Sequence, residues 1–247
     1  MFAASTMRTI KLAVAGGLLL GGLAAATPAA ADPVNLLQNG SFENGLAGWT
    51  ITGSETQGYD PVAIHYGAAA GYPTGAFGEA VFANPGGSNS PDAAGSRGAY
   101  FVSDLSQGQG LSQSLTLAPG TYQVGFSLYL PHNGFANIGD ATFTAALGGL
   151  TLLDVAASSL PAGVWLNYVS GAMVNVAGEQ AVAFSFSTDR MPSKDVVVDQ
   201  VYLIRGNPDV NGAPPHLAVV PEPASLALFG SGVLGLALLI GRRRRRG

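Results

Sequence analysis

Side chains that could do acid–base or nucleophilic chemistry are few and scattered in this chain. The three histidines, His65, His132 and His216, are far apart in sequence, and residues 32–220 contain no G-x-S-x-G, H-E-x-x-H or phosphate-loop motif. Glycoside hydrolysis needs only two carboxylates that the fold brings together. The acidic residues available for such a pair are Glu55, Asp60, Glu79, Asp140 and Asp189. No motif singles out two of them, so the sequence predicts a protein without enzymatic activity, with a glycan-active hydrolase as a remote alternative.

Aromatic residues with polar neighbours indicate a second chemistry, the binding of sugars. A flat ring covers the C–H face of a pyranose, while nearby amides and carboxylates bond its hydroxyls. Tyr59 and Tyr72 lie in glycine-rich segments and are the foremost candidates, whereas Trp49 is expected in the core. The full set of candidate sugar contacts is Trp49, Tyr59, Tyr66, Tyr72 and Trp165, with Asp60, His65 and Asn133 as polar partners. Each of these side chains could instead belong to the core or to its rim.

Two carboxylates near the ends of the exported part have apolar surroundings in the sequence. Asp199 alternates in phase with Val197, Val201 and Leu203, and Glu43 follows Phe42 in a short apolar strand. If that face is the core, each charge needs a cation or hydrogen-bond donors, because burying an unpaired charge costs several kcal/mol. Exposed carboxylates, or carboxylates that accept backbone N–H bonds, are the alternative, since both faces of residues 196–204 are apolar.

The N-terminus is typical of a secretory signal peptide. Arg8 and Lys11 form a basic region, residues 12–26 an apolar core, and residues 29–31 an A-x-A cleavage site before Asp32. Export of the chain through the inner membrane follows from this prediction.

The C-terminal end combines three features in order. Val220, Pro221, Glu222 and Pro223 lead into seventeen uncharged residues, 224–240, which as a helix would extend roughly 25 Å, at the short end of a membrane span. After Gly241 come five arginines, Arg242, Arg243, Arg244, Arg245 and Arg246, which basic-residue retention would place on the cytoplasmic side. The sequence therefore predicts a single transmembrane helix with a cytoplasmic basic end.

This tail resembles the PEP-CTERM sorting signal of Gram-negative bacteria. The resemblance covers residues 220–247 and implies cleavage near Pro-Glu-Pro by an exosortase, a transpeptidase-like membrane enzyme. It further implies a transient anchor in the inner membrane, followed by release toward the cell surface or an exopolysaccharide matrix. A plain single-span anchor is the alternative.

Both terminal signals conceal how acidic the exported part is. They contain seven of the eleven basic residues but only one of the fifteen acidic ones, Glu222. Residues 32–220 therefore carry four basic and fourteen acidic residues, a net charge of −10 against −4 for the whole chain. Such a domain should repel nucleic acid and can offer carboxylates to hard cations. The absence of cysteine excludes disulfides and thiolate chemistry.

Residues 32–205 show the pattern of an all-β domain. Period-two alternation is clearest in residues 122–130, which follow the turn at Pro119-Gly120 and are predicted to pair in a hairpin with residues 111–117. The other expected strands are residues 49–52, 62–66, 79–83, 99–102, 142–147, 164–169, 180–187 and 196–204. Many short strands separated by Gly, Asn and Pro predict a two-sheet β-sandwich.

Two segments depart from the strand pattern. Residues 67–98 are rich in Gly, Ala, Ser and Pro, and loops of that length are usually functional or loosely ordered. Residues 206–219 are predicted to be a flexible linker to the sorting signal.

The start and end of the domain carry a second resemblance. Residues 35–43 (NLLQNGSFE) with Gly48-Trp49, and residues 197–203 (VVDQVYL), are similar to the two ends of galactose-binding-like jelly rolls, including carbohydrate-binding modules and DUF642-type wall proteins. The resemblance implies a jelly roll whose first and last strands are neighbours, with Glu43 and Asp199 helping to hold a structural Ca²⁺. Carboxylate and backbone oxygens suit that hard ion.

These features leave two classes of function. One is an exported, exosortase-processed surface or matrix protein whose jelly roll binds carbohydrate, such as the cell's exopolysaccharide. The other is a structural or adhesive matrix protein that binds no sugar. Because both would use the same tail, the tail does not choose between them.

Overall fold

The computed structural model describes residues 33–53, 59–86, 90–175, 177–206 and 216–219 of the 247-residue chain. The predicted signal peptide, the predicted span 224–240 and the arginine run lie outside these residues. No helix in the described part is both long enough and apolar enough to cross a membrane.

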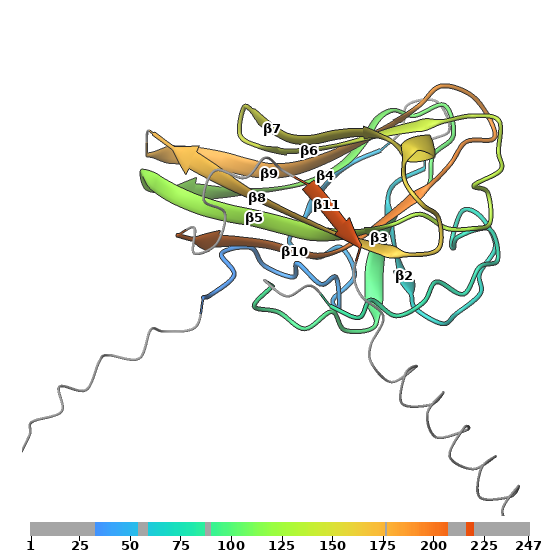
Figure 1. Cartoon of the computed structure of the whole chain (residues 1–247), viewed down its shortest axis with the longest axis horizontal. Helices are drawn as coiled ribbons and strands as arrows, with labels where there is room; N and C mark the ends of the chain where they lie inside the picture. The colour runs from blue at the N-terminus through green and yellow to red at the C-terminus, as the bar shows by residue number, and fades with distance from the viewer. Residues whose placement is uncertain (1–32, 54–58, 87–89, 176, 207–215, 220–247) are drawn as a thin grey trace, which may run out of the picture. The chain divides into compact units, whose positions relative to one another are not determined.

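Two antiparallel sheets pack face to face, which confirms the all-β sandwich (Figure 1). Sheet A has the order β1 (Thr50–Thr52), β4 (Gln107–Leu117), β9 (Gly178–Thr188), β6 (Ala141–Leu147) and β7 (Leu150–Ala156). Sheet B has the order β11 (His216–Val219), β8 (Trp165–Val174), β5 (Gly120–Tyr129), β10 (Val196–Arg205), β3 (Arg97–Phe101) and β2 (Val62–His65). A short 3₁₀ helix, Ala157–Ser159, follows β7.

The predicted hairpin of residues 111–117 and 122–130 is wrong. β4 pairs with β1 and β9 in sheet A, whereas β5 pairs with β8 and β10 in sheet B. The turn at Pro119-Gly120 therefore carries the chain from one sheet to the other. Alternation with a period of two shows which face of a strand is buried. It does not show which strand is its neighbour, because strands of both sheets turn an apolar face to the same core.

Three other segments differ from the sequence prediction. β7 was not predicted, because a register shift where it pairs with Ala145 and Ala146 of β6 interrupts its alternation. Residues 79–83 form no strand. Within the predicted linker, His216–Val219 form β11, which pairs with residues 166–169 at the edge of sheet B.

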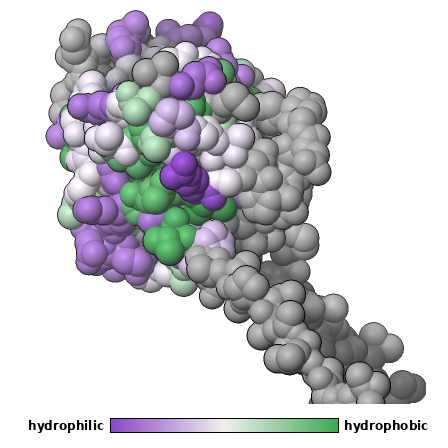
Figure 2. Space-filling model, turned by 90° about the vertical axis from the view of Figure 1, so that its left-hand side faces the viewer, coloured by the Kyte–Doolittle hydropathy of each residue, from purple (hydrophilic) through white to green (hydrophobic). Residues whose placement is uncertain are grey.

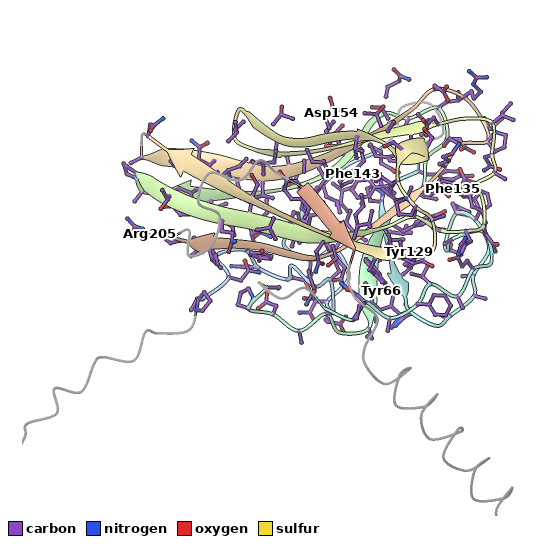
Figure 3. All side chains as sticks on the ribbon, viewed as in Figure 1. Tyr66, Tyr129, Phe135, Phe143, Asp154 and Arg205 are labelled. Atoms are coloured by element: carbon purple, nitrogen blue, oxygen red, sulfur yellow. The ribbon has the colours of Figure 1, made fainter. Side chains whose placement is uncertain are left out.

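The main core lies between the sheets and is rich in phenylalanine. Phe143 of β6 stacks on Phe184 of β9 with ring centroids 5.7 Å apart, and Phe126 of β5 stacks on Tyr168 of β8 at 4.7 Å. Figure 3 shows Phe143 between the sheets. Each such ring removes 150–250 Å² from water, on the order of 4–6 kcal/mol at about 25 cal/mol per Å². A core of this size explains how a chain without disulfides holds its fold.

A second apolar cluster covers the opposite face of sheet B. It contains Tyr100, Tyr129, Trp165 and Val197 from the strands, and Ala76 and Val81 from the long 67–96 segment. The described residues of this segment, 67–86 and 90–96, therefore form a covering layer on the sheet (Figures 1 and 3). Because this layer buries the second face of the sheet, both faces of β10 are apolar.

The N-terminal segment runs beside the last long strand. Leu36 N donates to Leu203 O at 2.8 Å, Val201 N donates to Gly40 O at 2.9 Å, and the Asn35 side chain bonds both Leu203 N and Val201 O. On β10, β3 pairs with residues 196–198 only. Beyond them, along the same edge of β10, the N-terminal segment bonds residues 201 and 203 in place of β3. The two ends of the domain are thus neighbours, as the second resemblance implies.

Candidate functional site

Three aromatic rings gather in loops beside sheet B. The ring of Tyr72 stacks on that of Phe77, with centroids 5.0 Å apart and an angle of 18° between the planes. Tyr59 meets Tyr72 edge-on at 5.7 Å and 83°. Tyr59 is 36% exposed, and Tyr72 and Phe77 are half-buried. The three side chains, here called the aromatic cluster, therefore combine fixed orientation with access to solvent.

Hydrogen bonds from neighbouring elements hold this cluster in place. Gln109 of β4 donates Nε2 to Tyr59 O at 2.9 Å, while its Oε1 accepts from Val102 N. Asn133 donates Nδ2 to Phe77 O at 3.1 Å. Because Gln109 is fully buried, the backbone that carries Tyr59 is tied to the body of the sandwich.

Glu79, two residues after Phe77, bonds the end of β5 and the loop that follows it. Its carboxylate accepts from Tyr129 Oη at 2.7 Å and from Asn133 N at 2.7 Å. Burial and the hydrogen bond to Glu79 raise the pKa of the Tyr129 hydroxyl, so it remains a donor at neutral pH. Glu79 therefore links the covering layer to β5 and to the loop after it.

Two exposed polar side chains belong to the segments that hold the aromatic cluster. Asp60 follows Tyr59 and is exposed, and Asn133 is exposed next to Phe77. Burial, followed by the charge of Asp104, raises the pKa of Tyr72 to about 12. The Tyr72 hydroxyl is therefore protonated at neutral pH. Aromatic rings with an exposed amide beside them, as Phe77 has in Asn133, are a composition found in sugar-binding sites.

Trp49 does not belong to this site. It is 7% exposed and packs in the main core against Phe42 at 5.5 Å and Phe184 at 6.1 Å. Its indole Nε1 donates to Asn39 O at 3.2 Å. The core position that the sequence favoured for Trp49 is correct, and its place among the candidate sugar contacts is not, because no ring face reaches solvent.

Trp165 is wrong as a candidate sugar contact for the same reason, whereas Tyr66 is half-buried and its place among these contacts stays a prediction. Trp165 is 5% exposed, packs against Tyr129 at 5.2 Å and donates Nε1 to Phe82 O at 3.0 Å. Tyr66 meets Trp165 edge-on at 5.6 Å and its hydroxyl is buried. Both rings support the covering layer (Figure 3 labels Tyr66), and His65 is exposed at the end of β2 opposite Arg97.

Glu43 ties the N-terminal segment to the start of β3. Its Oε1 accepts from Ser96 N at 2.7 Å and from Arg97 N at 2.9 Å, and its Oε2 accepts from Ser96 Oγ at 2.9 Å. Although burial acts to raise it, hydrogen bonds from Ser96 and Arg97 lower the pKa of Glu43 overall. This exposed carboxylate is ionised at neutral pH and is satisfied by protein donors.

Asp199 is fully buried, but not in the main core. A register shift between Asp199 and Tyr202, with Gln200 at φ 48°, changes the phase of β10, so that Val201 faces the main core while Asp199 lies under the covering layer. Its oxygens accept from Asn84 Nδ2 at 2.8 Å and from Gln200 N at 2.6 Å. Burial raises the pKa of Asp199 to about 7, and the charge of Glu43 acts in the same direction.

Glu43 and Asp199 are close enough to interact electrostatically, as the resemblance implies. Each carboxylate nevertheless accepts hydrogen bonds on both of its oxygens. Within the described ranges, no group of three or more His, Asp or Glu side chains is placed to hold a metal ion. Protein donors thus supply what a cation would supply here, and calcium at this pair stays a prediction.

Asp140 and Asp189 are the candidate catalytic carboxylates that the fold brings together. Asp189 Oδ1 accepts from Asp140 N at 2.7 Å, and Asp140 Oδ1 accepts from Ala141 N and Ser158 N at 2.9 Å. A backbone hydrogen bond from Asp140, and then the charge of Arg190, lower the pKa of Asp189. Both side chains therefore cap backbone at the ends of β6 and β9. Glu55 lies outside the described residues.

Two concave surfaces lie away from the aromatic cluster. One, of about 540 Å³, is an open hollow along the N-terminal segment, where Asn35, Asn39, Glu43 and Asp92 contribute polar atoms. The other, of about 200 Å³, lies at the end of the sandwich that contains the β6–β7 turn, where Figure 2 shows apolar side chains gathered. Its lining includes Leu147, Leu150, Ala172 and Val174. Neither surface presents an aromatic ring.

Sequence reasoning did not identify Phe77 or Glu79 as members of the site. Phe77 occurs in a run of Gly, Ala and Pro, where nothing distinguishes it from a core residue. Its backbone has φ 50°, which is rare for a residue with a large side chain, and its ring lies against Gly134. An aromatic residue in a glycine-rich loop beside two tyrosines was the available signal.

The tail matches a model of the PEP-CTERM protein-sorting motif over residues 219–246. The chain carries a PEP-CTERM sorting motif. This motif indicates an exported protein with a C-terminal sorting signal and implies processing by an exosortase. It begins at Val219, the last residue of β11, so the PEP-CTERM motif adjoins the sandwich directly.

No curated protein matches the chain. Solved structures with a similar fold include TmCBM61 in complex with β-1,4-galactotriose, with 20% identity, a TM-score of 0.46, and coverage of 70% of this chain and 99% of that one. Another is a family 16 carbohydrate-binding module, with 17% identity, a TM-score of 0.41, and coverage of 69% and 100%. A third is the K1 cleaved adhesin domain of Lys-gingipain from Porphyromonas gingivalis W83, with 18% identity, a TM-score of 0.41, and coverage of 67% of this chain and 95% of that one.

Proposed function

We propose that the sandwich is a non-catalytic carbohydrate-binding domain and that the aromatic cluster is its sugar platform. The observation that supports this most is the packing of Tyr59, Tyr72 and Phe77, in which rings held by neighbouring loops remain partly open to solvent. Each aromatic pair contributes about 1 kcal/mol beyond its buried area, enough to restrain the ring planes before a ligand arrives. Such preorganisation reduces the entropic cost of binding.

The polar groups nearby suit the hydroxyls of a neutral sugar. Asn133 lies next to Phe77, exposed Asp60 follows Tyr59 in the sequence, and the Tyr72 hydroxyl stays protonated. The domain carries a net charge of −10 over residues 32–220. Because like charges repel, a neutral polysaccharide is a better ligand than a highly anionic one.

The sorting motif supports sugar binding outside the inner membrane. We propose that the chain is anchored transiently in the inner membrane, is cleaved near Pro221, and is then released to the cell surface or an exopolysaccharide matrix. β11 ends at Val219, so cleavage at that point would leave the sandwich whole. The released domain would then bind the producer's exopolysaccharide or another glycan.

The exposed face of sheet A favours a second candidate function. Two cross-strand rows on it consist mainly of small side chains, namely Thr52, Gly110, Ser185 and Thr144, a row that ends at the exposed Asp154, and Thr50, Ser112, Ala183, Ala146 and Thr151. Sheets with such side chains can approach one another closely. This face suits a structural or adhesive matrix protein that binds no sugar.

Affinity electrophoresis tests the proposed function. The chain is run through gels that contain the producer's own polysaccharide, a panel of neutral glycans, or an anionic glycan. Retardation by at least one neutral glycan, and weaker retardation by the anionic one, is the expected result. Migration unchanged by every glycan would contradict sugar binding and favour the structural role.

A further inference from the structure

Two buried carboxylates, those of Asp104 and Asp195, lie close enough to the Tyr72 hydroxyl for their charges to act on it, and neither belongs to the aromatic cluster. Asp104 follows β3 and Asp195 precedes β10, at the point where Phe101 of β3 pairs with Val196 of β10. Each side chain is only 4% exposed. The charges of both act on the Tyr72 hydroxyl, and the charge of Asp104 acts on Asp195. The fold thus concentrates two acidic groups at one internal point.

Protein donors satisfy this pair only in part. Asp195 Oδ2 accepts from Tyr100 Oη at 2.6 Å, and Asp104 Oδ1 accepts from Ser193 N at 2.7 Å. Asp195 Oδ1 is buried and has no hydrogen-bond partner. An acceptor in this state costs about 1–3 kcal/mol, and more when it is charged. The pair therefore differs from Glu43 and Asp199, whose oxygens all receive donors.

Lys194 is the nearest cation in the sequence, but it is directed elsewhere. Its Nζ donates to Asn137 O and to Gly139 O, both at 3.0 Å, and lies 5.7 Å from the centre of the Phe135 ring. The ion pair found in the described part of the chain joins Arg190 to Asp189 at the surface. Neither buried carboxylate thus gains a side-chain cation.

A hard cation would stabilise the two buried carboxylates better than a proton would. One proton neutralises one carboxylate and leaves the other ionised in the same buried place, whereas a divalent ion offsets both charges. Carboxylate, hydroxyl and backbone oxygens are the ligands that Ca²⁺ takes. Burial raises the pKa of Asp195 well above its usual range, which shows the cost of ionising it with no cation present.

We propose that Asp104 and Asp195 bind a divalent hard cation, with Ca²⁺ as the probe, near the hydroxyl of Tyr72. The unpartnered Asp195 Oδ1 is the ligand atom that the protein leaves free for it. This site is separate from Glu43 and Asp199. Because Tyr72 belongs to the aromatic cluster, an ion here would also steady the sugar platform.

Terbium luminescence tests the site, because bound Tb³⁺ replaces Ca²⁺ and is excited through nearby tyrosines such as Tyr72 and Tyr100. The full chain, purified in detergent and stripped with a chelator, is titrated with Tb³⁺ and then competed with Ca²⁺. Saturable luminescence that Ca²⁺ displaces is expected. Asp195→Asn and Asp104→Asn should each weaken binding at least tenfold, and Asp154→Asn, which changes an exposed carboxylate on β7, should not.

Further variants separate this site from the other carboxylate pair. Luminescence that persists in Asp195→Asn and Asp104→Asn but disappears in Glu43→Gln or Asp199→Asn would overturn the proposal. Absence of a saturable signal in the unsubstituted chain would also overturn it. Melting curves give a second readout: Ca²⁺ should raise the melting temperature of the unsubstituted chain and not that of Asp195→Asn. If Asp195→Asn melts higher and Ca²⁺ has no effect on either chain, the carboxylates share a proton and the proposal is wrong.

Discussion

Tyr72 lies flat against Phe77, with ring centroids 5.0 Å apart and planes 18° apart, although the two residues belong to a segment without regular secondary structure. Phe77 is in turn bonded through its carbonyl to Asn133 of the loop after β5. A pair of rings is thereby fixed at the surface by contacts from two loops. The site depends on tertiary contacts that hold these loops in register.

The pH dependence of stability should report the burial of Asp199. Its pKa is about 7 in the folded protein, against about 3.9 for an unfolded chain. The folded state therefore binds more protons than the unfolded state between these values. The free energy of unfolding should fall as pH rises from about 4 to 7, by on the order of 4 kcal/mol at most, and then level off.

Denaturant unfolding at pH 5 and pH 8 measures this effect in the unsubstituted chain and in Asp199→Asn. The variant should lose the part of the difference that Asp199 contributes, because Asn cannot ionise, and should keep the part that comes from buried Asp195, whose pKa is also raised. Exposed Asp154→Asn serves as the control and should retain the difference. Equal pH dependence in all three proteins would show that Asp199 is not a titrating buried group.

Glu43 should contribute to stability through its three hydrogen bonds to Ser96 and Arg97. Glu43→Gln keeps the shape of the side chain but removes its charge and one acceptor oxygen. We expect a loss of about 1–2 kcal/mol in the free energy of unfolding at pH 7. A variant as stable as the unsubstituted chain would mean that these bonds have no net effect.

Calcium at Glu43 and Asp199, which the second resemblance implies, predicts a further effect. Removal of calcium with a chelator should lower the melting temperature, and Glu43→Gln should abolish that response. A chelator response that Glu43→Gln retains and Asp195→Asn loses would instead assign the ion to Asp104 and Asp195. An unchanged melting curve in the chelated protein would argue against calcium at either pair.

The sorting motif predicts the C-terminus of the exported protein. Mass spectrometry of the form released by producing cells should find a terminus near Pro221, without Arg242 to Arg246. Replacing Pro221 and Pro223 with alanine should leave the full tail in place and retain the chain in the membrane fraction. A released protein that still carries the five arginines would contradict processing by an exosortase.

The sequence predicted most strands because apolar and polar residues alternate in them, as in β5 and β9. It failed where the alternation is interrupted, at the register shift in β7 and at Gln200, which moves Asp199 from the main core to the covering layer. It also failed for the partner of β5, since pairing depends on contacts between distant segments. A local pattern indicates which residues of a strand are buried, but not to which of the two sheets the strand belongs.

The site was predicted in part for the same reason. The sequence points to Tyr59 and Tyr72 because aromatic residues in glycine-rich loops have few core positions available, and the structure brings them together. Only its residue type points to Trp165, and the packing of the covering layer that buries it cannot be predicted from local sequence. The partners that orient the cluster, Gln109 and Glu79, are distant in sequence from at least one group they bind.

The central claim, that the aromatic cluster binds sugar, is tested most directly by affinity electrophoresis of single alanine variants. Tyr59→Ala and Phe77→Ala are compared with Phe82→Ala, which removes an aromatic ring that is 67% exposed and lies outside the cluster. With folding checked by melting curves, Tyr59→Ala and Phe77→Ala should each bind the retarding glycan at least tenfold more weakly, a loss of about 1.4 kcal/mol. Phe82→Ala should bind as the unsubstituted chain does. Undiminished retardation of both cluster variants would contradict the claim.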